Sequence, residues 1–261
     1  MNRNIIYFVL LLGVLLSSCS QKNKEDEYYR KGWTLAWEDN FDKKLDLTQW
    51  SKIQRGKQHM YRYMNDSSAL YITKGGNLIL KGIADPSGSN NFPFLTGGIT
   101  REGFKANDIK RIEARVRVNG KVGATPYITL VPASGEENIS IDIMEQYGND
   151  DFVYHSVSSE YTTTQGMPDN PTSSVLVGVN PMNYHIYGVE KYPDSIVFYV
   201  DGMRTKKYPR ILTEIPGQFP FNELDMNLLI GLRLNHDTDP SVLPAEFHID
   251  WVRYYEPKTE E

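Results

Sequence analysis

The sequence contains one cysteine among 261 residues, so no disulfide can form within the chain. After the first twenty residues it has no apolar run long enough to span a bilayer as a helix. It also lacks an excess of basic charge, because 28 Lys and Arg stand against 33 Asp and Glu, a net charge of −5. Nucleic-acid binding draws on concentrated positive charge, so this balance argues against a nucleic-acid partner.

Helical periodicity is also missing, since no segment predicts a helix of more than two turns and no internal repeat is found. Short β-branched or aromatic runs instead follow one another, separated by Gly, Asn, Asp and Pro. The clearest runs are 78–80, 111–118, 195–200 and 247–255. This pattern predicts an all-β sandwich formed by one domain, residues 32–257, rather than a parallel α/β sheet.

Two dipeptides, Asn119-Gly120 and Asp201-Gly202, predict tight hairpin turns, because these residue types adopt positive φ at low cost. In the run 111–118, apolar side chains alternate with charged ones. The charged positions are Arg111, Glu113, Arg115 and Arg117. We expect most of these charged side chains to face water.

Residues 1–31 predict a sorting signal and a tether rather than part of the fold. Arg3 precedes an apolar run, 5–16, and Leu16-Ser17-Ser18-Cys19 resembles a bacterial lipobox. On this interpretation 1–18 is a signal peptide and Cys19 is acylated, while 19–31, polar and aperiodic, is a flexible linker. The alternative is a lone buried thiol after an ordinary secretory signal.

These features predict a lipoprotein of the bacterial cell envelope that meets the membrane through its lipid anchor only. The acidic cluster 25–27 in the linker favours the outer membrane, with exposure at the cell surface as a further option. A solvated linker needs no such purpose, so the face of the membrane stays open.

The most informative segment is Ser140-Ile141-Asp142-Ile143-Met144-Glu145. Because side chains alternate along a strand, Ser140 and Asp142 share a face, with the intervening isoleucines buried behind it. Glu145 falls on the wrong face by strict counting. A β-bulge near Ile143-Met144 returns Glu145 to the face of Asp142. We therefore expect three polar side chains in a row on one sheet surface.

This segment resembles the bulged-strand motif Glu-x-Asp-x-x-Glu of glycoside hydrolase family 16, the laminarinase-like enzymes. Other segments resemble the family in its own order over nearly the whole mature chain: 32–41 (GWTLAWEDNF), 96–99, 110–115, 187–190, 193–202 and 249–255. The resemblance implies a concanavalin A-like jelly roll of two antiparallel sheets. It also implies an endo-acting glycosidase of β-linked polysaccharides that needs no cofactor.

The chain departs from the family motif at its first position, where Ser140 replaces the glutamate that serves as the nucleophile. The resemblance carries the acid/base role to Glu145 and keeps Asp142 between the two. A retaining glycosidase needs two carboxyl groups about 5–5.5 Å apart, and a serine hydroxyl is a poor nucleophile without an activating base. Glu136 and Glu137 lie too far upstream for the motif spacing and predict a loop; a bent loop that brings Glu137 to the site is the alternative.

The aromatic floor of the family's groove is altered as well. The family's usual Trp-Pro-x-x-Trp appears here as 125–129 (TPYIT), with threonine at both tryptophan positions. Lys191 and Ser158 stand where the family often has a tryptophan and a histidine. All four tryptophans lie near the ends of the chain: Trp33, Trp37, Trp50 and Trp251. Sugars stack on aromatic faces, so Tyr127 and Tyr147 are the remaining aromatic candidates for substrate binding. Arg233 is a further candidate, as a hydrogen-bond donor.

Asp250 matches a position that helps to hold a structural calcium ion in some members of the family. Calcium takes six to eight oxygen ligands, and one aspartate does not supply them. We therefore expect a hydrogen-bonded aspartate in a strand, with calcium as the alternative.

Three functions follow from these observations. The first is a surface lipoprotein that binds a β-linked glycan, with hydrolysis lost or greatly weakened. The second is an active endo-acting glycosidase with a displaced carboxylate or an inverting mechanism through Glu145. The third is a structural or assembly subunit without a sugar ligand. The missing nucleophile favours the first and third, and the retained Asp142 and Glu145 favour the first.

Overall fold

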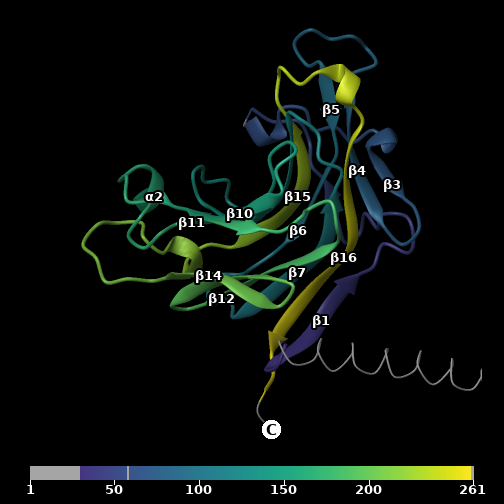
Figure 1. Cartoon of the computed structure of the whole chain (residues 1–261). Helices are drawn as coiled ribbons and strands as arrows, with labels where there is room; N and C mark the ends of the chain where they lie inside the picture. The colour runs from purple at the N-terminus through teal and green to yellow at the C-terminus, as the bar shows by residue number, and fades with distance from the viewer. Residues whose placement is uncertain (1–29, 58, 260–261) are drawn as a thin grey trace, which may run out of the picture.

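The computed structural model describes residues 30–57 and 59–259. The predicted signal peptide, Cys19 and nearly all of the predicted linker lie outside the described residues. The described chain forms two antiparallel β-sheets packed face to face (Figure 1). This confirms the all-β sandwich. No helix within the described ranges is long and apolar enough to cross a membrane.

The first sheet has nine strands in the order β14-β13-β12-β7-β16-β4-β3, with β1 paired to β16 and β5 paired to β4. Its strands are β1 (Trp33–Asp39), β3 (Tyr71–Thr73), β4 (Leu78–Ala84), β5 (Phe94–Thr96), β7 (Lys110–Val118), β12 (His185–Tyr192), β13 (Ser195–Val200), β14 (Met203–Pro209) and β16 (Ala245–Pro257).

The second sheet has seven strands in the order β11-β10-β9-β8-β15-β6-β2. Its strands are β2 (Ser51–Lys52), β6 (Gly98–Glu102), β8 (Ala124–Pro132), β9 (Ser140–Glu145), β10 (Phe152–Ser158), β11 (Ser174–Gly178) and β15 (Met226–Leu234). Short helices lie in the connections: η1 (His59–Tyr61), η2 (Ser68–Leu70), α2 (Glu160–Thr163), η3 (Pro220–Asn222) and η4 (Pro240–Val242).

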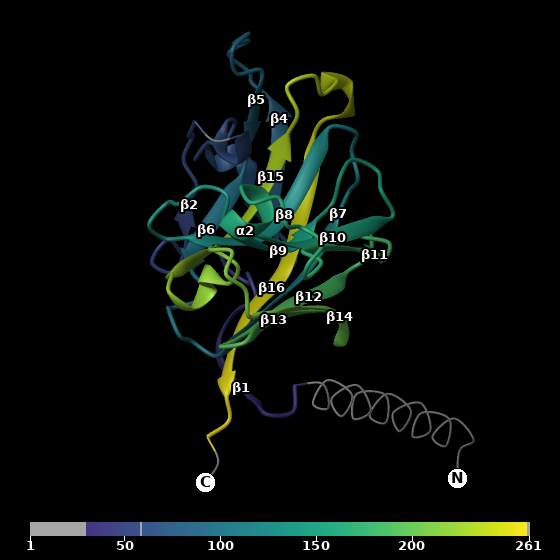
Figure 2. The ribbon, with the colours of Figure 1, turned by 90° about the vertical axis from the view of Figure 1, so that its left-hand side faces the viewer.

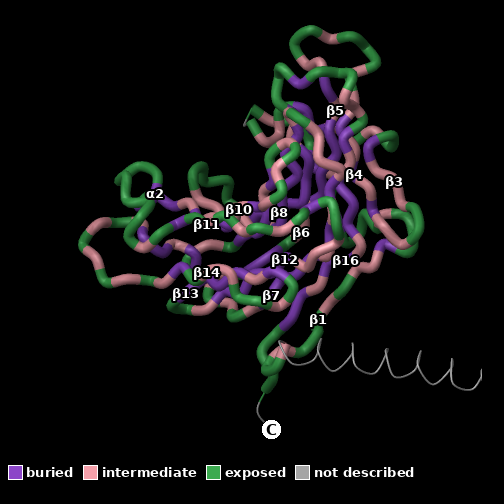
Figure 3. The backbone as a smooth tube through the Cα atoms, viewed as in Figure 1, coloured by how far each residue is buried: buried purple, intermediate pink, exposed green. Residues whose placement is uncertain are grey.

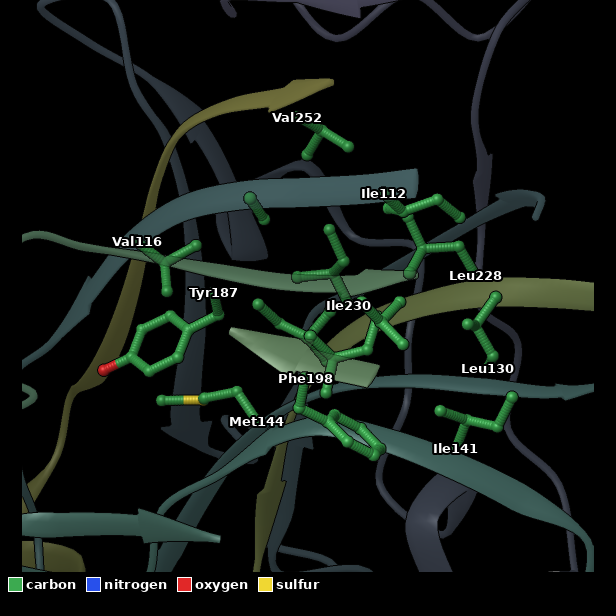
Figure 4. Packing of buried hydrophobic residues seen from close by; sticks show 14 of the residues in the cluster. Ile112, Val116, Leu130, Ile141, Met144, Tyr187, Phe198, Leu228, Ile230 and Val252 are labelled. Carbon is green, nitrogen blue, oxygen red and sulfur yellow. The ribbon is translucent and has the colours of Figure 1, made fainter. Parts of the chain in front are cut away.

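The hydrophobic core lies between the two sheets, where the buried stretches of the strands face one another (Figure 3). Ile112 and Val116 from β7 pack in the same cluster as Leu130 from β8 and Ile141 and Met144 from β9 (Figure 4). Full burial of such side chains contributes about 1.5–3 kcal/mol each. The core therefore fixes the backbones of β8 and β9 from behind, and with them the side chains on their other face.

The two predicted turns have different outcomes. Asp201-Gly202 joins β13 to β14 with φ angles of 50° and 79°, which confirms the hairpin. Asn119-Gly120 is not a hairpin, because β7 belongs to the nine-stranded sheet and β8 to the seven-stranded sheet. The segment crosses between layers, and the Asn119 side-chain oxygen accepts a hydrogen bond of 2.7 Å from the backbone N–H of Glu246.

The charged face of β7 also differs from the expectation. Arg111 and Glu113 are each only 1% exposed, although Arg115 and Arg117 keep partial contact with water. The Arg111 guanidinium donates to Glu113 at 2.8 Å and to Glu190 at 2.6 Å, and lies 4.8 Å from the ring centre of Tyr199. Large aromatic side chains cover this part of the sheet, and the buried charges are paired beneath them.

We predict that Arg111→Ala lowers the free energy of unfolding by about 3–5 kcal/mol, because Glu190 and Glu113 would lose a charge partner inside the protein. Urea unfolding of the domain measures this. Arg204→Ala, an exposed position on β14 of the same sheet, is the matched control and should change stability by no more than about 0.5 kcal/mol. Equal losses for both variants would contradict the prediction.

Candidate active site

The bulge in β9 has the predicted position. In the pairing with β8, Met144 lies opposite Ile128 and Asp142 opposite Thr129, so Ile143 has no partner. Ile143 and Met144 are both buried. The extra residue turns Glu145 to the face that carries Ser140 and Asp142, and the row of three polar side chains is confirmed.

Asp142 lies at the centre of a group of hydroxyls. It accepts hydrogen bonds from Thr129 on β8 at 2.6 Å, from Ser140 on β9 at 3.0 Å and from Ser156 on β10 at 2.7 Å. Three adjacent strands thus each contribute one donor. Because the carboxylate charge is shared among three hydroxyls, Asp142 is poorly placed to take the proton of Ser140 and activate it as a nucleophile.

Glu145 is the second carboxyl group of the row. Burial raises its pKa, and the negative charge of Asp142 raises it further, while Arg233 and the hydroxyl of Tyr147 act in the opposite direction. The Tyr147 hydroxyl donates to Glu145 at 3.0 Å, and the Arg233 guanidinium lies 4.0 Å from the other carboxylate oxygen. A carboxyl group with a raised pKa retains a proton that it can donate, which suits a general acid.

A pocket of about 500 Å³ opens at Ser140. Ser140 and Ser158 line it together with Arg233, η1 and the loop 135–139. Figure 2 shows α2 and the strands β8, β9 and β10 in this part of the molecule. Glu136 and Glu137 lie in the 135–139 loop, as predicted, and both line the same pocket as Ser140.

Tyr127 requires a correction. It lies opposite Glu145 in the β8–β9 pairing, but its ring is only 1% exposed and packs against Ile53, Met64 and Leu229. The segment that contains Ile53 and Met64 covers this part of the sheet. The ring is therefore not available to stack on a sugar, and sequence alone gave no signal that a distant segment would cover it.

Tyr147 and Arg233, the other two candidates, lie beside Glu145, and Tyr147 is 40% exposed. Two aromatic residues that sequence reasoning missed extend this surface. Tyr154 meets Tyr147 edge-on at 5.6 Å between ring centres, and Phe152 meets Tyr154 at 5.5 Å. The alternation of half-buried Phe152, Tyr154 and Ser156 on β10 is the signal that could have found them.

The remaining predicted positions are structural in this fold. Trp50 is buried and donates to Asp39 at 2.9 Å, and the buried Lys191 ammonium donates to backbone carbonyls of Lys105 and Asp108. Asp250 pairs with Arg115. No group of three or more His, Cys, Asp or Glu in the described part of the chain could hold a metal ion.

Residues 105–253, more than half of the chain, match the family model described as glycosyl hydrolases family 16. A keratan-sulfate endo-1,4-beta-galactosidase of Sphingobacterium multivorum is 25% identical over 238 residues, which cover 85% of this chain and 55% of that protein. The chain thus spans about half the length of this relative. A beta-glucanase of Rhodothermus marinus is 25% identical over 267 residues, which cover 94% of this chain and 92% of that protein.

Solved structures support the fold. A structure from work on endo-acting O-glycanases of human gut microbiota that initiate mucin breakdown superposes with a TM-score of 0.72 at 22% identity, over 86% of this chain and 100% of that chain. A Glu-to-Ser mutant of a non-specific endo-beta-1,3(4)-glucanase, which presents 1,3-beta-D-cellobiosyl-glucose at its active site, superposes with a TM-score of 0.70 at 18% identity. It covers 86% of this chain and 95% of that chain. These matches confirm the jelly roll of two antiparallel sheets.

We predict that the pKa of Glu145 responds to its two neighbours with opposite signs. Asp142→Asn removes a negative charge and should lower this pKa, whereas Tyr147→Phe removes a hydrogen bond to the carboxylate and should raise it. Titration of the Glu145 side-chain carboxyl by carbon-detected NMR measures both shifts. Shifts of the same sign in the two variants would contradict the assignment of causes.

Proposed function

This chain belongs to glycoside hydrolase family 16, and from this we propose that it binds a β-linked polysaccharide or glycan in the pocket at Ser140, with hydrolysis lost or greatly weakened. One observation carries the proposal: the residue two positions before Asp142 is a serine whose hydroxyl donates to that aspartate. A neutral alcohol at this place offers no charge to an oxocarbenium-like centre and no carboxylate to attack it.

The chemistry of hydrolysis suffers more from this replacement than binding does. A barrier higher by about 1.4 kcal/mol slows a reaction tenfold, so the loss of a nucleophile costs several orders of magnitude. Binding, in contrast, depends on hydrogen bonds and stacking. The hydroxyls around Asp142, the carboxyl of Glu145, the guanidinium of Arg233 and the exposed ring of Tyr147 supply these contacts.

The relatives support a β-linked ligand. One curated relative is named as an endo-1,4-beta-galactosidase of keratan sulfate, and another is named as a beta-glucanase. The Glu-to-Ser mutant that presents a glucan at its active site supports the idea that this fold can retain a glycan where a serine replaces a glutamate.

We further propose that the domain is held at the bacterial envelope by acylated Cys19, with the outer membrane as its location. The lipobox-like Leu16-Ser17-Ser18-Cys19 supports this. We predict that the full-length protein incorporates labelled fatty acid and fractionates with the outer membrane, while Cys19→Ala does neither. If Cys19→Ala still fractionates with the outer membrane and is labelled with fatty acid at another site, the proposal is wrong.

An active endo-glycosidase is the second candidate, because Glu137 lines the same pocket as Ser140. In this case Glu145 protonates the leaving oxygen, and Glu137 activates a water on the opposite side of the sugar. Inverting glycosidases place their two carboxyl groups about 6.5–9.5 Å apart to hold that water.

We predict that the purified domain binds one or more of a set of glycans and releases no new reducing ends from them. The set contains β-1,3-glucan, mixed-linkage glucan, galactan, keratan sulfate and mucin O-glycans. Calorimetry measures binding, and a reducing-end assay measures hydrolysis. Tyr147→Ala should weaken binding by about tenfold, because it removes an exposed ring and a hydroxyl that lie beside Glu145 and Arg233.

Variants separate the candidates. If the natural chain hydrolyses a glycan, and both Glu145→Gln and Glu137→Gln abolish this hydrolysis, the second proposal replaces the first. Ser140→Glu restores a carboxylate, and we expect little gain in hydrolysis because threonine stands at both tryptophan positions of the groove floor. The absence of binding and hydrolysis with every glycan would leave a structural or assembly role.

A further inference from the structure

Positive charge is concentrated in one short segment of this acidic protein. Residues 55–62 contain Arg55, Lys57, His59 and Arg62 and no acidic residue, although the whole chain carries a net charge of −5. Arg55, Lys57, His59 and Arg62 are exposed. The segment includes η1, which lines the pocket at Ser140. A segment that continues from one side of the pocket is therefore much more basic than the protein as a whole.

Among the described residues, no carboxylate forms an ion pair with the three cations Arg55, Lys57 and Arg62. The Arg55 guanidinium instead lies 4.2 Å from the ring centre of Phe92, and that of Arg62 lies 5.6 Å from the ring centre of Tyr63. Stacking on a ring orients a guanidinium and leaves its N–H groups available for another acceptor.

The basic segment borders the pocket through His59, and Arg233 of β15 lines the same pocket. Burial lowers the pKa of His59, and the positive charges of Arg233 and Arg62 lower it further, so His59 lies within reach of both guanidinium charges and is itself neutral at pH 7. The Nε of Arg233 is buried and has no hydrogen-bond partner among the described residues. The ion pair of Arg233 with Glu145 is long at 4.0 Å. Two guanidinium groups beside a cleft favour a bound anion.

The pocket also has an acidic side, because Glu136 and Glu137 of the loop 135–139 line it. An anionic group on a ligand is attracted toward η1 and repelled by this loop. A ligand with one charged edge and one neutral edge therefore has a single favourable orientation, with its charged edge on the side of η1.

We propose that the glycan bound at this site is anionic, and that Arg55, Lys57 and Arg62 together with Arg233 bind its sulfate esters or carboxylates along the η1 side of the pocket. This rests on the function proposed above and specifies its substrate class. Arginine suits both groups, because its planar fork can donate two parallel hydrogen bonds to one sulfate or carboxylate.

Calorimetric titrations with matched ligands test this. The natural domain is titrated with keratan sulfate, with the same polymer after chemical desulfation, and with a sialylated mucin O-glycan that carries carboxylates. We expect keratan sulfate or the sialylated glycan to bind at least about tenfold more tightly than the desulfated polymer. The preference should shrink between low and high salt, because exposed charges are screened. The better of the two anionic ligands identifies the source of the charge.

Two substitutions locate the effect. Arg62→Gln and Lys57→Gln should each weaken binding of the anionic glycan by about threefold to tenfold and leave the desulfated polymer within about twofold. Both residues are exposed, so the fold should tolerate the changes. Arg204→Gln on β14 in the other sheet removes the same charge far from the pocket and should change neither affinity.

The outcomes separate this inference from the proposed function. Equal affinity for sulfated and desulfated polymer, with Tyr147→Ala weakening both, would overturn the anionic ligand and leave glycan binding in place. Equal binding of dextran sulfate, an α-linked sulfated polymer, would show an unselective charged surface and would also overturn it. No binding to any glycan would overturn both proposals.

Discussion

The site depends on one irregularity of the backbone, the bulge at Ile143-Met144. Without it, strict alternation would place Glu145 in the core face, where an ionised carboxyl group costs several kcal/mol without a partner. With it, both bulge residues are buried and Glu145 joins Asp142 on the outer face. The hydrophobic effect thus fixes the bulge, because two consecutive apolar side chains must both enter the core. The polar row is its consequence.

The two carboxyl groups of this row have different environments. Asp142 accepts three hydroxyl donors, whereas Glu145 has one hydroxyl donor and a distant guanidinium. The negative charge of Asp142 then contributes to the raised pKa of Glu145. Glu145 therefore holds its proton more readily than an isolated carboxyl group does, which is the property that a general acid needs. The position of Ser140 carries no charge.

The features that could be predicted from the sequence are those that depend on residues close together in the chain. Alternation, which by strict counting puts Glu145 on the wrong face, predicted the bulge near Ile143-Met144, and the residue types of Asp201-Gly202, which tolerate positive φ, predicted their hairpin. Contacts between distant segments could not be read in this way. Asn119-Gly120 has the residues of a hairpin but crosses between the layers, and the Tyr127 ring is covered by a segment more than sixty residues upstream.

For the proposed anionic ligand, a neutral side chain at Ser140 and the positive charge of Arg55, Lys57 and Arg62 would act in the same direction. A carboxylate at position 140 would repel a sulfate about 8 Å away by roughly 2 kcal/mol at an effective dielectric constant of about 20. A serine has no such repulsion and places a hydrogen-bond donor and acceptor in the lining of the pocket. In the proposed complex, Arg55, Lys57 and Arg62, which have no ion pair among the described residues, would add attraction. A site selected for hydrolysis gains from the carboxylate, because it stabilises positive charge at the anomeric carbon. A site that holds an anionic glycan gains from the absence of that carboxylate, so a serine at this position is consistent with both proposals, weak hydrolysis and an anionic ligand.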